Sequence, residues 1–226
     1  MRAVIFDLDG TLADTAGDLL AAANAALAPE GMALLDPVED RPVAGRGGRA
    51  MIRRSIAKQG NDPDSTAMVA LTDALYPRLL EAYGARLAEE THLYDGVVPC
   101  LDLLEDAGWK LGICTNKPER LALALMEELG VLHRFGALLG ADTLPVRKPD
   151  PEHLVETCRR IGADPARAIL IGDTETDLRT ARNAQIPCIL TTFGFAEGPV
   201  ADLAPDAILD HYRDLPNLAE RFVPTA

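Results

Sequence analysis

Two aspartates stand directly after the apolar start of the chain. Asp7 and Asp9 follow the run Ala3–Phe6, are separated by one leucine and precede Gly10 and Thr11. On a strand predicted over residues 3–8, side chains two positions apart lie on the same face. Two like unit charges about 4 Å apart repel by roughly 4 kcal/mol at an effective dielectric constant of about 20. Such a pair of carboxylates requires either a shared proton or a bound cation.

Further polar residues follow other apolar segments of the chain. They are Thr115 and Asn116, Lys148 in the loop before Pro151, and Asp173 and Asp177 in the segment GDTETD. In an open parallel sheet, ligands bind beyond the carboxyl ends of the strands, so these side chains are expected on one rim. Four carboxylates in one place require a cation, and all-oxygen ligation together with a phosphate suits Mg²⁺. The Lys148 ammonium and the Thr115 hydroxyl suit phosphate oxygens.

The elements that must position these residues alternate between strand and helix. Strands are predicted over residues 3–8, 110–115, 137–140, 168–172 and 188–191, and helices near 97–107, 118–129, 151–162 and 175–185. This alternation predicts an α/β fold with a Rossmann-like parallel sheet and helices on both faces.

The stretch between the first strand and the rest has only helical patterning. We therefore expect an α/β core from residues 1–14 and 92–226, with an inserted all-α domain over residues 15–91. The pair Thr15 and Asp18 has the spacing of a capping box at the start of the first inserted helix.

Composition narrows the partners and the compartment. The net charge of the 226 residues is −13, so nucleic acid and anionic membrane surfaces are poor partners. The four cysteines form no CxxC pair and lie in apolar segments, which favours reduced core residues. The short apolar start does not resemble a signal peptide, and no apolar stretch approaches the roughly 20 residues of a membrane span. A cytoplasmic protein, monomeric or homodimeric, is expected.

Each motif alone has a simpler interpretation. The two N-terminal aspartates suit a turn, Thr115-Asn116 a helix N-cap, Lys148 a solvated loop, and GDTETD the acidic start of a helix. Their joint occurrence at strand ends, in this order, favours a functional site.

These motifs resemble those of the haloacid dehalogenase superfamily of aspartate-nucleophile phosphotransferases. The match rests on DLDGT (7–11), Thr115-Asn116, Lys148 in KPDP, and GDTETD (172–177), and the helical insertion resembles that family's cap, which would close over the site. The resemblance implies that Asp7 is the nucleophile that forms an aspartyl-phosphate and that Asp9 is the general acid and base. It implies Mg²⁺ held by Asp7, the Asp9 backbone carbonyl and Asp173, with Asp177 in support. The phosphoryl group would be held by Thr115, Asn116 and Lys148.

Within the superfamily the chain is most similar to phosphoglycolate phosphatases. The similarity covers CTNKPERL (114–121), residues 135–154, and AGRGGRAMI (44–52). It implies a Mg²⁺-dependent hydrolase of a small anionic phosphate monoester, 2-phosphoglycolate first among them. The glycine-rich loop 45–49 leads into a helix N-terminus, a favourable place for an anion, and its Arg46 and Arg49 are candidates to bind the substrate carboxylate. A hinge between helices is the simpler interpretation of that loop.

Other functions share parts of this pattern. A phosphomutase of the β-phosphoglucomutase type or a pyrophosphatase of the same superfamily would carry the same motifs. A phospho-accepting signalling receiver would have about half this length and would place its lysine after all the acids. A phosphate-binding module would not need both Asp7 and Asp9.

Overall fold

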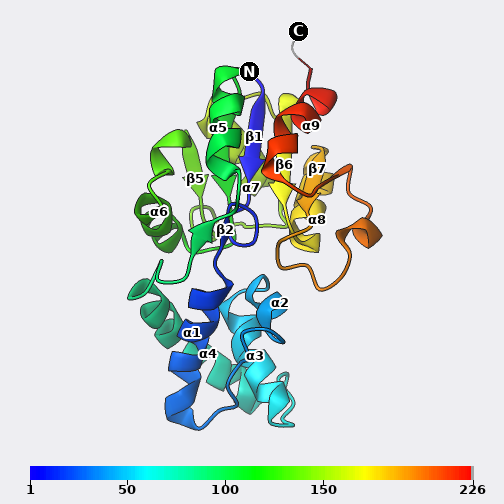
Figure 1. Cartoon of the computed structure of the whole chain (residues 1–226). Helices are drawn as coiled ribbons and strands as arrows, with labels where there is room; N and C mark the ends of the chain where they lie inside the picture. Colours follow the sequence, from blue (N-terminus) through cyan, green and yellow to red (C-terminus); the bar gives the residue numbers. More distant parts are fainter. Residues whose placement is uncertain (225–226) are drawn as a thin grey trace. The chain divides into compact units, whose positions relative to one another are not determined.

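The computed structural model describes residues 1–224 of the chain. The chain divides into two compact units. One consists of Met1–Asp14 and the chain from Leu93 onward, and the other is Thr15–His92. Figure 1 shows the first unit as a sheet with surrounding helices and the second as helices.

A six-stranded parallel sheet forms the centre of the first unit, in the order β5-β4-β1-β6-β7-β8. The strands are β1 (Ala3–Phe6), β4 (Lys110–Cys114), β5 (Ala137–Leu139), β6 (Ala168–Gly172), β7 (Cys188–Thr191) and β8 (Ala207–Leu209). Phe6, the last residue of β1, is in register with Ile113 of β4 and Ile171 of β6. The central strands therefore end level with one another, and the residues that follow them meet at one rim.

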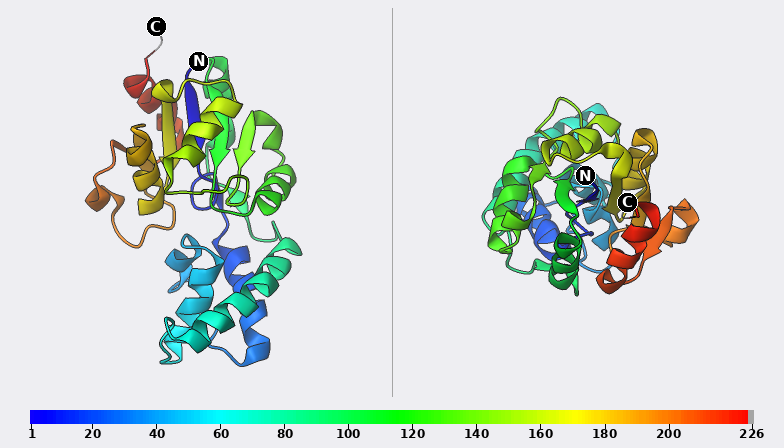
Figure 2. Two further views of the ribbon diagram at one scale, coloured as in Figure 1. Left: turned by 180° about the vertical axis from the view of Figure 1, so that it is seen from behind. Right: turned by 90° about the horizontal axis from the view of Figure 1, so that it is seen from above.

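Helices cover both faces of this sheet (Figures 1 and 2). They are α5 (Val97–Asp106), α6 (Glu119–Glu128), α7 (Pro151–Arg160), α8 (Glu175–Ala184) and α9 (Leu215–Phe222). Short 3₁₀ turns are η2 (Leu132–Arg134), η3 (Pro165–Arg167), η4 (Val200–Leu203) and η5 (Tyr212–Asp214). Helices α7 and α8 pack against each other on one face, and α5 packs with α9 on the other. The predicted α/β class with helices on both faces is confirmed.

The second unit is built from packed helices: α1 (Ala16–Leu27), η1 (Ala28–Glu30), α2 (Arg41–Ala44), α3 (Gly48–Lys58) and α4 (Thr66–Gly84). Helix α1 packs against α4 and α3. The core of this second unit contains five almost fully buried side chains, those of Leu27, Ile52, Ile56, Leu79 and Tyr83. The chain leaves and returns through β2 (Ala13–Asp14) and β3 (His92–Leu93), which pair with each other in a two-stranded sheet.

The capping box expected at Thr15 does not form. The Asp18 side chain turns instead to the far end of the insertion, where it accepts hydrogen bonds from the Thr91 amide at 2.9 Å and the Thr91 hydroxyl at 2.7 Å, and from the Glu90 amide. A carboxylate that accepts hydrogen bonds from backbone and hydroxyl donors makes charge-assisted bonds, which are stronger than neutral ones. The acid that the pattern assigned to the helix start thus fastens the two ends of the helical unit together.

One further expectation needs correction. The first strand ends at Phe6 and not at Leu8, because the carbonyl of Leu8 already accepts the amides of Thr11, Leu12 and Ala13 in a tight turn. Strand β8 and helix α9 were not predicted at all. All four cysteines are free and buried, as expected.

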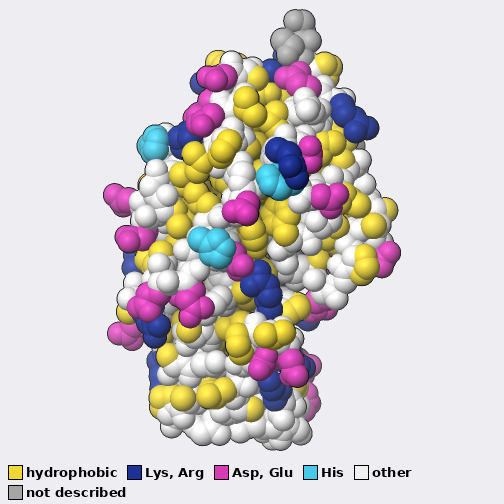
Figure 3. Space-filling model, viewed as in Figure 1, with side chains coloured by type: hydrophobic (Ala, Val, Ile, Leu, Met, Phe, Trp, Pro, Cys, Tyr) yellow, Lys and Arg dark blue, Asp and Glu magenta, His cyan; other side chains and the backbone are white. Residues whose placement is uncertain are grey.

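On the surface seen in Figure 3, Lys and Arg side chains are scattered among acidic ones. No helix of residues 1–224 is long and apolar enough to cross a membrane.

His153 of α7 is fully buried and ties that helix to the loop after β5 by donating a hydrogen bond from Nε2 to the Gly140 carbonyl at 3.0 Å. Its Nδ1 has no partner among the described residues. Burial, and then the positive charge of Lys148, lower the pKa of His153 from 6.5 to about 4.

This histidine should make stability depend on pH. Since its folded-state pKa lies below the unfolded value, the unfolded chain binds the proton more readily, and the free energy of unfolding contributed by this site falls as pH drops from about 6.5 to about 4. The loss amounts to at most about 3 kcal/mol. Urea denaturation at pH 7 and pH 4.5 should show a smaller pH dependence for His153→Gln than for the wild type. The exposed control His133→Gln should retain the wild-type difference, and an unchanged pH dependence in His153→Gln would contradict the assignment.

Candidate active site

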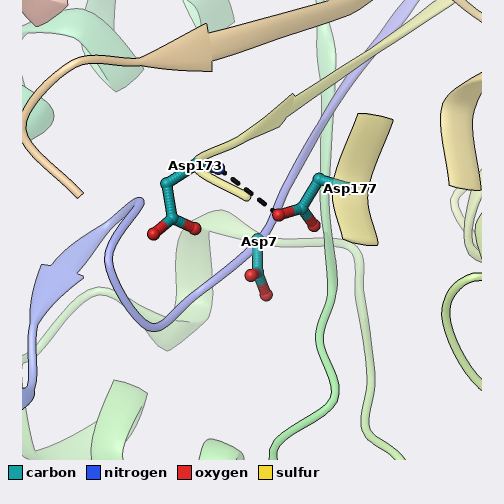
Figure 4. A group of neighbouring side chains, drawn as sticks. All are labelled: Asp7, Asp173 and Asp177. Atoms are coloured by element: carbon teal, nitrogen blue, oxygen red, sulfur yellow. Dashed lines mark hydrogen bonds between the residues drawn. The ribbon is translucent and has the colours of Figure 1, made fainter. Parts of the chain in front are cut away.

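Three buried carboxylates meet at the carboxyl rim of the sheet. Asp7 follows β1, Asp173 follows β6, and Asp177 lies in the first turn of α8. One oxygen from each lies within 4.8 Å of the others, and Figure 4 shows the three groups converging. The ends of the paired strands β1 and β6 therefore bring a group of acids together.

Hydrogen bonds fix two of these acids. Asp177 Oδ2 accepts from the amides of Asp173 at 3.3 Å and Thr174 at 3.1 Å, and from the Thr174 hydroxyl at 2.8 Å (Figure 4 marks the first of these). Asp173 Oδ2 accepts from the Phe195 amide at 2.7 Å, and its Oδ1 accepts from the Thr11 hydroxyl at 3.3 Å. The carboxylates are thus oriented before anything binds.

Lys148 is the cation closest to this group. Its side chain is 1% exposed, and Nζ donates to Asp177 Oδ1 at 2.6 Å and lies 2.9 Å from Asp7 Oδ1. The contact with Asp7 is a buried ion pair, and a carboxylate oxygen has a second lone pair with which it can still accept. Burial alone would lower the pKa of Lys148, but the charges of Asp177 and Asp7 outweigh it and raise that pKa above its usual value.

The negative charges of the acids are less well compensated than the positive charge of Lys148. Burial is the largest cause that raises the pKa of Asp7 from 3.8 to about 6, since the attraction of Lys148 offsets it only in part. Burial, followed by the charges of Asp177 and Asp7, also raises the pKa of Asp173 well above its ordinary value. A bound cation would reverse this, because it stabilises the ionised carboxylates. Oriented oxygens with spare acceptor capacity fit a hard divalent cation.

A second lysine, missed in the sequence, pairs with Asp9. Lys117 Nζ donates to Asp9 Oδ1 at 2.8 Å, and the two side chains are 3% and 18% exposed. Asp9 is not a member of the three-carboxylate group, but it is close enough for its charge to contribute to the raised pKa of Asp7. The signal in the sequence was the position of Lys117 directly after the Thr115-Asn116 pair. With Lys148, this lysine offsets two of the four acidic charges at the rim.

The remaining predicted core residues lie in the loop after β4. Thr115 is buried, and its Oγ1 accepts a hydrogen bond from the Lys117 amide at 3.2 Å. The exposed Asn116 donates from Nδ2 to the Lys148 carbonyl at 3.0 Å, which ties this loop to the lysine loop. Contact of Thr115 and Asn116 with a phosphoryl group remains a prediction.

The two arginines proposed to bind substrate belong to the helical unit. Both are exposed. Arg49 forms an ion pair with Asp73 and lies over the ring of Tyr76, with Cζ 4.4 Å from the ring centroid. Any anion bound by Arg49 would have to compete with Asp73. The binding role of Arg46 and Arg49 remains a prediction.

Comparison with known proteins places this site in a family. Residues 4–191 match the haloacid dehalogenase-like hydrolases. A phosphoglycolate phosphatase of Mesorhizobium japonicum is 42% identical over 224 residues, covering 99% of this chain and 97% of the relative. The chain belongs to the haloacid dehalogenase-like hydrolases.

Other proteins show the same likeness. A phosphoglycolate phosphatase of Agrobacterium fabrum is 40% identical, with 97% of this chain and 93% of the relative covered. The crystal structure of a predicted phosphoglycolate phosphatase from Haemophilus somnus has a TM-score of 0.85 at 25% identity, covering 96% of this chain and 97% of that one. Membership of this hydrolase family confirms the resemblance drawn from the four motifs, and with it the expectation of a phosphoglycolate phosphatase-like enzyme that hydrolyses phosphoric monoesters.

Two glycines of this hydrolase surround Asp173 so closely that no side chain fits. A Cβ at Gly194 would lie 2.3 Å from Asp173 Cβ and 2.5 Å from the Gly10 carbonyl oxygen, and a Cβ at Gly10 would lie 2.2 Å from Asp173 Oδ2. Gly194 lies in the loop after β7, so a third strand end helps to place this carboxylate.

The close approach predicts that Gly194→Ala lowers the free energy of unfolding by about 1–3 kcal/mol, the usual cost of overpacking a buried site. Gly198→Ala is a matched control in the same loop, because nothing lies within 4 Å of a Cβ there. It should change stability by no more than about 0.5 kcal/mol. Urea denaturation of both variants measures the difference, and equal stabilities would show that the loop yields without cost.

Proposed function

We propose that this enzyme is a Mg²⁺-dependent phosphatase that hydrolyses 2-phosphoglycolate through an aspartyl-phosphate on Asp7. The observation that carries the proposal is the buried group of Asp7, Asp173 and Asp177 beside Lys148. Binding of phosphate alone would not call for three buried acids. The substrate is suggested by the relatives named phosphoglycolate phosphatase, which match almost the whole chain.

In the first step, an Asp7 carboxylate oxygen attacks phosphorus, and the bond from phosphorus to the bridging oxygen breaks. Lys148, in contact with Asp7, holds that carboxylate and attracts the phosphoryl oxygens. Asp9 is the group beside this centre that has no place in the three-carboxylate cluster. It gives its proton to the leaving oxygen, which departs as the alcohol.

In the second step, water attacks the phosphorus of the aspartyl-phosphate. Asp9, now a carboxylate, takes a proton from this water, and the bond from phosphorus to Asp7 breaks to release inorganic phosphate. One difficult hydrolysis is thereby divided into two easier displacements. Thr115 and Asn116 are proposed to position the phosphoryl oxygens.

The oxygens of Asp7 and Asp173 and the backbone carbonyl of Asp9 would hold Mg²⁺, and Asp177 would orient the Asp173 segment through its amide. When bound, this cation neutralises charge between the anionic nucleophile and the anionic phosphoryl group. The raised pKa values of Asp7 and Asp173 support a cation at this place, because its charge would lower both pKa values and stabilise the ionised carboxylates.

The first test replaces the nucleophile. Asp7→Asn should lower phosphate release from 2-phosphoglycolate by at least about 10³-fold, as expected when a covalent nucleophile is lost. The exposed Asp202→Asn serves as a matched control and should retain wild-type activity. Mass spectrometry must exclude deamidation of the variant. Activity of intact Asp7→Asn within tenfold of the wild type would contradict an aspartyl-phosphate on Asp7.

The second test removes the metal. Chelation with EDTA should abolish phosphate release, and Mg²⁺ should restore it. Ca²⁺ should not restore it, since Ca²⁺ takes more ligands in a looser geometry. Mg²⁺ should also raise the melting temperature of the wild type but not of Asp173→Asn. Full activity after exhaustive chelation would contradict the dependence on a metal.

A further inference from the structure

The Lys117–Asp9 ion pair has no role in the chemistry described above. Lys117 is nearly buried, and its backbone is fixed on both sides, by its amide on Thr115 Oγ1 at 3.2 Å and by its carbonyl, which accepts from the Ala141 amide at 2.9 Å. The ammonium is therefore held at a defined place beside Asp9. A desolvated cation is costly unless an anion accompanies it.

Asp9 marks the side of the site where the leaving group departs. This step rests on the proposed function, in which Asp9 protonates the bridging oxygen. A donor in that role must lie within hydrogen-bond reach of the oxygen, and Lys117 Nζ lies 2.8 Å from the Asp9 carboxylate. The ammonium is thus on the side of the site where the leaving group departs.

The leaving group of 2-phosphoglycolate carries a carboxylate separated from the bridging oxygen by one methylene. Lys148 is already engaged by Asp177 and Asp7 deep in the site. Lys117 lies on the correct side, and an ammonium has three N–H donors. Its present partner is a carboxylate of the same charge and shape as the one on the substrate.

We propose that Lys117 recognises the carboxylate of the leaving group, which takes the place of Asp9 on its ammonium. The exchange keeps the buried cation paired. It also frees Asp9, which has lost its cationic partner, to take up a proton from solvent and turn to the bridging oxygen. A leaving group without a carboxylate cannot replace Asp9 on Lys117. Asp9 then stays paired with the ammonium, so a substrate with a neutral leaving group is disfavoured. Lys117 is then a specificity-determining residue, located in the core unit.

Binding of two inert analogues tests this without relying on turnover. 3-Phosphonopropionate replaces the bridging oxygen of 2-phosphoglycolate by a methylene, and propylphosphonate has the same chain without the carboxylate. Calorimetry in the presence of Mg²⁺ should show that Lys117→Met weakens 3-phosphonopropionate by roughly 10- to 150-fold, the value of one charged hydrogen bond. Propylphosphonate should change by less than about threefold.

Three further variants sharpen the comparison. Lys110→Met is the matched control, because Lys110 is exposed at the start of β4, the strand that precedes Lys117. Both affinities should be unchanged. Lys117→Arg should recover part of the preference. Asp9→Asn removes the competing carboxylate and should bind 3-phosphonopropionate more tightly than the wild type, with propylphosphonate unchanged, which keeps the test decisive if Lys117→Met fails to fold.

Kinetics complete the test. The ratio of kcat/KM for 2-phosphoglycolate over ethyl phosphate should fall in Lys117→Met by the same factor as the binding preference. Equal losses for both substrates would mean that Lys117 only positions Asp9, and no loss would remove it from the site. Either result overturns the proposal while leaving the phosphatase intact. Failure of the proposed function is distinct, because the wild type would then hydrolyse neither ester.

Discussion

The structure depends on the repulsion among acids gathered at one edge of a sheet. Asp7, Asp173 and Asp177 are buried with their oxygens within 4.8 Å of one another. Water does not screen these buried charges. The Lys148 ammonium and directed backbone and hydroxyl donors compensate them instead. The compensation is incomplete, since the pKa of Asp7 still rises to about 6. That remaining deficit of positive charge would favour a bound cation at this site.

The fold supplies the rigidity that this arrangement requires. The parallel strands end level, so a residue placed directly after β1, β4 or β6 reaches the same rim without a long loop. Glycines then allow neighbouring loops to approach more closely than any side chain would permit, as at Gly194 against Asp173. The amide of Phe195, delivered by this close approach, is one of the donors that orient the carboxylate.

Much of this arrangement was predictable because the strands and helices of the first unit follow from local patterns of apolar and polar residues. Strands β4, β6 and β7 are short apolar runs followed by polar residues, and their positions were predicted to within one residue. The family itself followed from four motifs, three of which lie at the ends of β1, β4 and β6 and the fourth in the loop before α7. Strand β8 has three residues and only one of them is buried, so its sequence carries little of the apolar signal on which the prediction relied.

Side-chain pairings were harder to predict than elements. Asp18 has the spacing of a local cap, yet its partners lie more than 70 positions away at Thr91, and no local pattern contains that information. The period of a strand placed Asp9 on the same face as Asp7, although that strand in fact ends at Phe6. The ion pair of Asp9 with Lys117 was not predicted, because Lys117 follows a different strand and a pairing between distant segments is set by the topology of the sheet.

The connection between the helical unit and the sheet has a consequence for the evolution of such a protein. The outgoing segment β2 and the returning segment β3 are hydrogen-bonded neighbours. The two ends of the insertion are therefore one strand spacing apart, however many residues the insertion contains. Lengthening a loop between fixed, adjacent ends costs little entropy. The helical unit is in this sense a detachable module, which can be enlarged, shortened or replaced by recombination while the charged rim and its supporting strands stay the same.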